Sequence, residues 1–156
     1  MTDNRYGQPV EILLVEDNPG DIRLIVDVLK DGKLPNKVSV VRDGVEALAF
    51  LRSEGQYADV ADPDLILLDL NLPKKDGREL LEEIKKDPDL KHIPVVVLTT
   101  STADQDIINA YDLHANCYVN KPLDLEQFIK MVHSIEDFWF TIASLPVGRR
   151  KLAVSE

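Results

Sequence analysis

Five short apolar runs occur along the chain, and longer segments of mixed polarity separate them. The runs are rich in β-branched residues and do not alternate with polar positions, which is typical of strands buried on both faces of a parallel sheet. We expect strands at residues 12–15, 38–41, 65–70, 95–98 and 117–119.

The segments between the runs carry signals that start helices. Each opens on a residue that can cap a helix, and apolar side chains then recur at spacings of three and four. Asp43 and Glu46 have the spacing of a capping box, and Pro19 suits a first helical position. The last helix is the longest and runs to about residue 146. The expected helices follow Asn18, Asp43, Asp76, Thr102 and Asp124.

Five alternations of strand and helix predict a doubly wound α/β fold with a five-stranded parallel sheet. Right-handed crossovers leave few topologies, and one open sheet is the most economical. Residues 56–63 are expected to form a loop. The sequence contains no repeat, low-complexity stretch or interior linker, so we expect a single domain.

Composition narrows the function. The 156 residues suffice for one domain, and 44% hydrophobic with 29% charged residues is typical of a folded protein. A net charge of −10 argues against nucleic acid and anionic membranes and favours cations and basic protein surfaces. Cys117 is the single cysteine, so no internal disulfide or thiolate metal site is expected. No signal peptide is recognisable, which predicts a cytoplasmic protein.

Polar side chains follow the expected strands at their carboxyl ends, where open α/β sheets bind ligands. Glu16 and Asp17 follow the first strand, and the third ends at Asp69, two residues before Asn71. Further polar residues at this edge are Thr99, Thr100 and Ser101 after the fourth strand, and Asn120 and Lys121 after the fifth.

Converging carboxylates need a cation, because each close pair costs about 4 kcal/mol at an effective dielectric constant of about 20. Acidic oxygen ligands suit Mg²⁺, which binds readily beside phosphate. With Mg²⁺ and Lys121 added, the charges of Glu16, Asp17 and Asp69 sum to zero. The same groups suit phosphoryl chemistry, in which a carboxylate can be the acceptor. The sequence has no P-loop, dinucleotide fingerprint or hydrolase nucleophile elbow.

These residues resemble the receiver domain of two-component response regulators, over about residues 11–144. The resemblance rests on the acidic pair, on Asp69 in the segment LILLDLNLPKKDG, on Thr99, and on Lys121-Pro122. The intervals are typical of the family: 52 residues from Asp17 to Asp69, 30 from Asp69 to Thr99, and 52 from Asp69 to Lys121. The family's fold is flavodoxin-like, with strand order 2-1-3-4-5, five helices and here an extended last helix.

The resemblance implies a role for each acidic residue. Asp69 would be the phosphoacceptor and a metal ligand. Asp17 would bind Mg²⁺ directly, Glu16 would bind it through water, and the backbone carbonyl of Asn71 would complete the protein's share. Mn²⁺ could substitute. Glu16 stands where the family more often has aspartate, which lengthens the reach to the metal.

The remaining site residues would bind the phosphoryl group or respond to it. Lys121 would pair with the group, and the Lys121-Pro122 bond would be cis. Thr99 would turn toward the phosphoryl group, and the ring of Tyr118 would follow as the switch aromatic. Thr100 fills a position that the family often gives to a smaller residue, which would narrow donor access.

Within the family, the chain resembles the stand-alone regulators of cyanobacterial phytochrome sensor kinases, through residues 71–101 and the aromatic end of the last helix. This implies a light-sensing histidine kinase as partner. We also expect a domain over residues 1–146 and a tail over 147–156, which leaves too few residues for an output domain. The protein would catalyse only its own phosphorylation and dephosphorylation. Output would then be protein contact, phosphate relay or feedback on the kinase.

Three other interpretations stay open. A receiver-like interaction module that is never phosphorylated would have the same fold. An aspartyl-nucleophile Mg²⁺-dependent phosphatase would share the metal site, but such enzymes usually have a second acid where Asn71 stands. A buried ion pair between Asp69 and Lys121 would be purely structural.

The last helix has more apolar surface than one face against a sheet requires. A broader core would explain the surplus, and so would a homodimer interface anchored by aromatic residues. We favour the dimer. Its candidate face comprises Phe128, Met131, Ile135, Phe138, Trp139 and Ile142.

Overall fold

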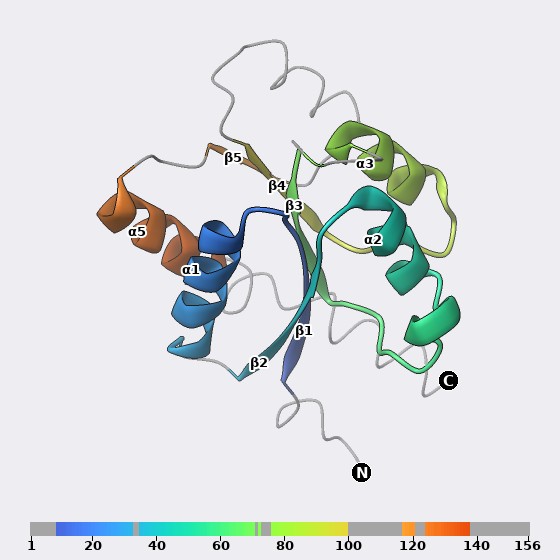
Figure 1. Cartoon of the computed structure of the whole chain (residues 1–156), viewed down its shortest axis with the longest axis horizontal. Coiled ribbons are helices and arrows are strands. Elements are labelled where there is room, and N and C mark those ends of the chain that lie inside the picture. The colour runs from blue at the N-terminus through green and yellow to red at the C-terminus, as the bar shows by residue number, and fades with distance from the viewer. Residues whose placement is uncertain are drawn as a thin grey trace.

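The computed structural model of the chain describes residues 9–32, 35–70, 72, 76–99, 117–120 and 124–137 (Figure 1). The side chains of Thr99, Cys117, Tyr118, Asn120 and Glu136 are outside this description. The strands are β1 (Val10–Val15), β2 (Asn36–Val41), β3 (Leu65–Asp69), β4 (Val95–Thr99) and β5 (Cys117–Asn120). The α-helices are α1 (Pro19–Lys30), α2 (Gly44–Leu51), α3 (Gly77–Lys86) and α5 (Leu125–Glu136).

The sheet confirms the sequence prediction closely. All five strands lie where the apolar runs are, and they pair in parallel in the order β2-β1-β3-β4-β5 of a flavodoxin-like fold. The helix expected after Thr102 lies outside the described residues, as does any extension of the last helix beyond residue 137. The expected loop at 56–63 shares residues with a short 3₁₀ helix, η2 (Gly55–Tyr57).

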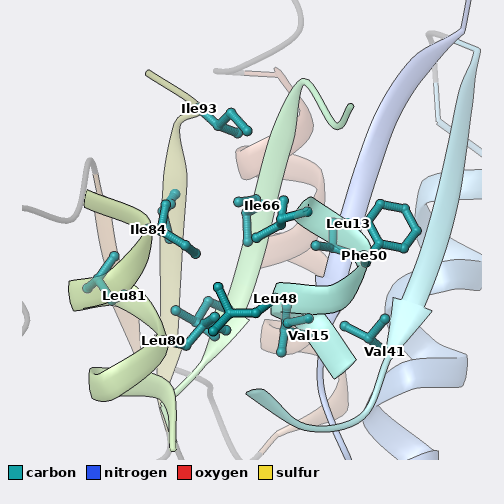
Figure 2. Packing of buried hydrophobic residues seen from close by; sticks show 14 of the residues in the cluster. Leu13, Val15, Val41, Leu48, Phe50, Ile66, Leu80, Leu81, Ile84 and Ile93 are labelled. Atoms are coloured by element: carbon teal, nitrogen blue, oxygen red, sulfur yellow. The ribbon is translucent and has the colours of Figure 1, made fainter. Parts of the chain in front are cut away.

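Both faces of the sheet are buried, and successive strand residues serve opposite faces. One core cluster joins Leu13, Val15, Ile66 and Leu68 to the apolar faces of α2 and α3. Figure 2 shows Leu13, Val15 and Ile66 of this cluster beside Leu48 of α2 and Leu80 of α3. The second cluster joins the intervening strand residues to α1 and α5 on the other side. Figure 1 shows this layering, with α1 and α5 on one side of the sheet and α2 and α3 on the other.

The helix caps follow the sequence signals, with one difference. Asn18 accepts a hydrogen bond from the Asp21 backbone N–H at 3.0 Å, and Asp124 caps α5. Asp43 caps α2 by accepting from the Glu46 N–H at 2.8 Å. Glu46, however, does not return a bond to Asp43 but accepts from the Arg42 N–H at 3.0 Å, so the expected capping box is incomplete.

A complete capping box occurs at α3 instead. Asp76 accepts from the Glu79 N–H at 3.0 Å, and Glu79 accepts from the Asp76 N–H at 3.3 Å. The two hydrogen bonds of this capping box therefore fix the first turn of α3, which lies close to the end of β3.

The structure corrects the candidate dimer face on α5. Phe128 and Ile135 are only 5% and 8% exposed, and they belong to the protomer's own core beside α1. With Val132 between them, at spacings of four and three, they form the face of α5 that packs in the core, so these two residues are removed from the dimer face. Met131 is partly buried against the same cluster. Phe138, Trp139 and Ile142 lie outside the described residues.

No helix among the described residues combines the length and the apolar character that a membrane crossing requires.

Candidate functional site

Strand register brings two buried acidic residues, Glu16 and Asp69, to one edge of the sheet. Val15 of β1 lies opposite Leu68 of β3, so the next residues along, Glu16 and Asp69, leave the sheet at the same level. The strands are parallel, which means that both carboxyl ends face the same way. The sheet thus positions acidic side chains that are 53 residues apart in the sequence.

Glu16, Asp17 and Asp69 form a compact acidic cluster at this edge. One carboxylate oxygen from each residue lies within 4.8 Å of those from the other two. Glu16 is 0% exposed and Asp69 is 6% exposed, whereas Asp17 is open to solvent. The three carboxylates that the sequence predicted as metal ligands are therefore brought together.

The backbone around the cluster is fixed by hydrogen bonds. The Glu16 N–H donates to the Val41 carbonyl of β2 at 3.0 Å, which extends the β1–β2 ladder past the end of the strand. The Glu16 carboxylate accepts from the Asn18 N–H at 3.2 Å, at the start of α1. Glu16 is thereby tied to both the sheet edge and the first helix.

The cluster fits a hard divalent cation. Each pair of carboxylates at this separation repels by about 4 kcal/mol at an effective dielectric constant of about 20. A divalent ion among them adds attractions that outweigh this repulsion, and carboxylate oxygens are ligands that Mg²⁺ and Mn²⁺ prefer. The solvent-facing Asp17 leaves an approach for the ion and for further ligands.

The structure describes the other predicted site residues only in part. Thr99 ends β4 and pairs in register with Asn120 of β5, one residue beyond the Asp69–Leu98 pair, so its backbone is at the same edge. Tyr118 lies within β5, and the side chains of Thr99 and Tyr118 are outside the description. Asn71, Thr100, Lys121 and Pro122 lie outside the described residues altogether.

One neighbour of the cluster was not predicted as a site residue. The Gly77 N–H, at the start of α3, donates to the Leu70 carbonyl at 3.0 Å, directly after Asp69. The sequence signalled Gly77 only as part of a helix start. No sequence pattern reveals how closely the helix approaches the strand, because that depends on the packing of α3.

The chain belongs to the response regulator receiver domain family, whose model matches residues 12–133. It is 54% identical over 140 residues to the response regulator Rcp1 of Synechocystis sp., covering 90% of this chain and 95% of Rcp1.

Two solved structures are similar in both fold and sequence. The phosphorylated cyanobacterial phytochrome response regulator RcpA is 58% identical with a TM-score of 0.83, covering 85% of this chain and 95% of that one. The Mn²⁺-bound form of Rcp1 is 55% identical with a TM-score of 0.81, covering 84% of this chain and 94% of that one.

Proposed function

We propose that this chain is a phosphorylatable response regulator that accepts a phosphoryl group on Asp69 from a phosphohistidine of a sensor histidine kinase. The observation that carries the proposal is the acidic cluster of Glu16, Asp17 and Asp69 at the carboxyl edge of the sheet, in which Glu16 and Asp69 are buried. Membership of the receiver family and similarity to a phosphorylated relative support it.

The proposed metal is Mg²⁺, with Mn²⁺ able to substitute. Asp17 and Asp69 would bind it directly, Glu16 through water, and the Asn71 carbonyl would complete the protein ligands. When bound, the metal neutralises charge on the phosphoryl oxygens. The Mn²⁺-bound relative supports this assignment.

In the proposed transfer, a carboxylate oxygen of Asp69 attacks the phosphorus of the phosphohistidine. A P–O bond forms, the P–N bond breaks, and the imidazole nitrogen leaves with the electron pair and takes up a proton. Burial of Asp69 at 6% exposure limits water at the acceptor oxygen. Lys121 would pair with the transferred group, after a cis Lys121-Pro122 bond, and Thr99 with its neighbour Thr100 would line the entry.

The proposed response is a shift between two pre-existing conformations. Thr99 would turn toward the phosphoryl group, and Tyr118 on β5 would follow it. Both residues belong to neighbouring strands at one side of the sheet, so a change at Thr99 can reach β5 directly.

We propose a phytochrome-type kinase as the partner, because RcpA is a cyanobacterial phytochrome response regulator. We also propose that residues 1–146 form the receiver domain, with 147–156 as a tail, and that output is protein contact.

A homodimer through Met131, Phe138, Trp139 and Ile142 is the proposed assembly. Size-exclusion chromatography with light scattering, with and without acetyl phosphate, tests it against the Trp139→Ala variant.

The phosphoacceptor is tested by intact-mass spectrometry after incubation with acetyl phosphate and Mg²⁺. We expect one phosphoryl adduct on the wild-type protein and none on Asp69→Asn. Asp64→Asn is the matched control, because Asp64 is 8% exposed and lies at the opposite end of β3. It should be phosphorylated like the wild type.

The outcomes separate the alternatives. Equal adduct on Asp69→Asn would refute the acceptor assignment. If no variant gains an adduct, with acetyl phosphate or with a phosphorylated phytochrome kinase, the result would support the alternative that the chain is a receiver-like interaction module that is never phosphorylated. Multiple turnover on a phosphomonoester would indicate a phosphatase.

A further inference from the structure

We propose that Gly77 is a positioning residue for Asp69. Without a side chain, the first turn of α3 rests directly against the backbone that follows the phosphoacceptor, and so holds the Asp69 carboxylate in the acidic cluster. The inference rests on the proposed function, since it concerns how that site is kept in register.

The approach of α3 to β3 leaves no room for a Cβ atom. A Cβ on Gly77 would lie 2.4 Å from Leu70 Cα, 2.6 Å from the Asp69 carbonyl oxygen and 2.9 Å from the Leu70 carbonyl carbon. Cβ atoms essentially never approach heavy atoms within 3.0 Å, and all three of these atoms are backbone. They cannot rotate away as the end of a flexible side chain can.

Conformation does not account for glycine at this position. Gly77 is helical, and alanine is intrinsically preferred over glycine in a helix. The close approach therefore opposes a larger residue, while helix propensity favours one.

The helix cannot easily retreat from the strand. The capping box of Asp76 and Glu79 fixes its first turn. Behind that turn, Leu80, Leu81 and Ile84 are 0% exposed in the core between α3 and the sheet. Figure 2 shows Leu80 and Ile84 extending from α3 toward the sheet.

A steric clash at position 77 would therefore be relieved mainly by movement of the strand backbone at Asp69 and Leu70. The Leu70 N–H donates to Leu98 of β4 at 3.1 Å, and its carbonyl accepts from Gly77 at 3.0 Å. Leu70 thus links α3 to the sheet, and Asp69 is the residue before it. A Cβ at position 77 would push on the Asp69 carbonyl itself, so the Asp69 side chain would leave its place among the three carboxylates.

The test compares Gly77→Ala with Leu29→Ala, a cavity-forming variant of α1 in the core cluster on the opposite face of the sheet from α3. Urea unfolding gives the stability of each variant. All binding is measured under conditions in which circular dichroism shows that both variants are folded. Isothermal titration with Mg²⁺ and the rate of adduct formation with acetyl phosphate are the readouts. Gly77→Ala should lose about 10²-fold in rate, as a misplacement of about 1 Å does, and should bind Mg²⁺ more weakly. Leu29→Ala should keep both.

A second pair of variants covers the case in which Gly77→Ala does not fold. Asp76→Ala loosens the first turn of α3 and should slow adduct formation, whereas Asp76→Asn, which caps equally well, should restore the wild-type rate. Wild-type Mg²⁺ affinity and rate in Gly77→Ala, or in Asp76→Ala if Gly77→Ala is unfolded, would overturn the inference.

Failure of the proposed function looks different. If the wild type binds Mg²⁺ but never gains a phosphoryl group, the proposed function fails, and the Mg²⁺ affinities of Gly77→Ala and Leu29→Ala still decide the role of Gly77. A wild type that binds no Mg²⁺ overturns both.

Discussion

Ser53 follows α2 in a left-handed conformation, with φ of 56°. It is the one non-glycine residue of the described ranges with a positive φ. The end of α2 imposes this geometry, because the Glu54 N–H reaches back to the Ala49 carbonyl at 2.9 Å, in the manner of a Schellman motif. An L-residue in this region carries a conformational cost that glycine does not.

Ser53→Gly should therefore stabilise the protein, by about 0.5–1 kcal/mol in the free energy of unfolding. Urea denaturation at neutral pH measures the change. Ser53→Ala is the control and should bring no gain, because alanine keeps the Cβ. A stability for Ser53→Gly at or below that of the wild type would contradict the assigned strain.

Tyr57 gives the protein a pH dependence at alkaline pH. Its hydroxyl donates to Glu46, and this hydrogen bond, with desolvation and the carboxylate charge, raises the pKa of Tyr57 to about 12. The folded state thus favours the neutral phenol. This stabilisation is complete below the ordinary tyrosine pKa of about 10 and is lost as the pH rises through about 12.

We expect the stability difference between the wild type and Tyr57→Phe to be constant up to about pH 10 and to shrink above it. Phenylalanine keeps the ring contact with Phe50, whose centroid lies 5.1 Å from that of Tyr57. Urea unfolding of both proteins across this range measures the difference, and comparison of the two removes titrations that they share. A difference that grows with pH would refute the sign.

Residues differ in how far the sequence reveals them. Glu16, Asp17 and Asp69 are predictable because each follows an apolar strand, and parallel strands end at a common edge. Gly77 is not, since its role depends on a distance between helix and strand that no spacing encodes. The partial capping box at Asp43 shows the same limit, because Glu46 has two other partners within reach, Arg42 and Tyr57.

At the scale of the element, α5 shows what helical periodicity leaves undecided. A spacing of three and four identifies a buried face, but the same pattern serves a protomer's core and a partner's surface. Here Phe128, Val132 and Ile135 turn to the core, whereas Leu125 at the start of the helix is 60% exposed. Only the packing of α1 against α5 separates these cases.

The buried and the exposed apolar residues of α5 should respond differently to truncation of their side chains. Phe128→Ala should lower the free energy of unfolding by about 3–5 kcal/mol, because it empties a filled site in the core. Leu125→Ala should change it by less than about 0.5 kcal/mol. Chemical denaturation of both variants measures this, and a small loss for Phe128→Ala would mean that α5 is only loosely packed.

At the scale of the whole molecule, the acidic cluster adds local repulsion to a chain that already carries a net charge of −10. Binding of Mg²⁺ to the folded state should therefore raise stability by mass action, by about 2.7 kcal/mol at 100 times the dissociation constant. Thermal unfolding with Mg²⁺ and with chelator measures the gain. Asp17→Asn should reduce it, and an equal gain in that variant would exclude Asp17 as a ligand.

The architecture was predictable from the sequence to a large extent. Five buried runs alternating with capped segments admit few arrangements, and the parallel sheet in the order β2-β1-β3-β4-β5 is among the simplest. Strand ends differ from the prediction by one or two residues, as with β1, which begins at Val10. Backbone ladders continue into polar positions such as Glu11, which hydrophobicity alone does not mark.

The pairing of Val15 with Leu68 also determines when the acidic cluster can form during synthesis and folding of the chain. During synthesis, a chain that has not yet reached β3 carries Glu16 and Asp17 but lacks both Asp69 and the strand that places it beside them. The acidic cluster can therefore form only after β3 has been made and a loop of about fifty residues has closed. An incompletely made chain thus lacks the assembled acidic cluster, and under the proposed function it could accept a phosphoryl group only once the central strand has folded.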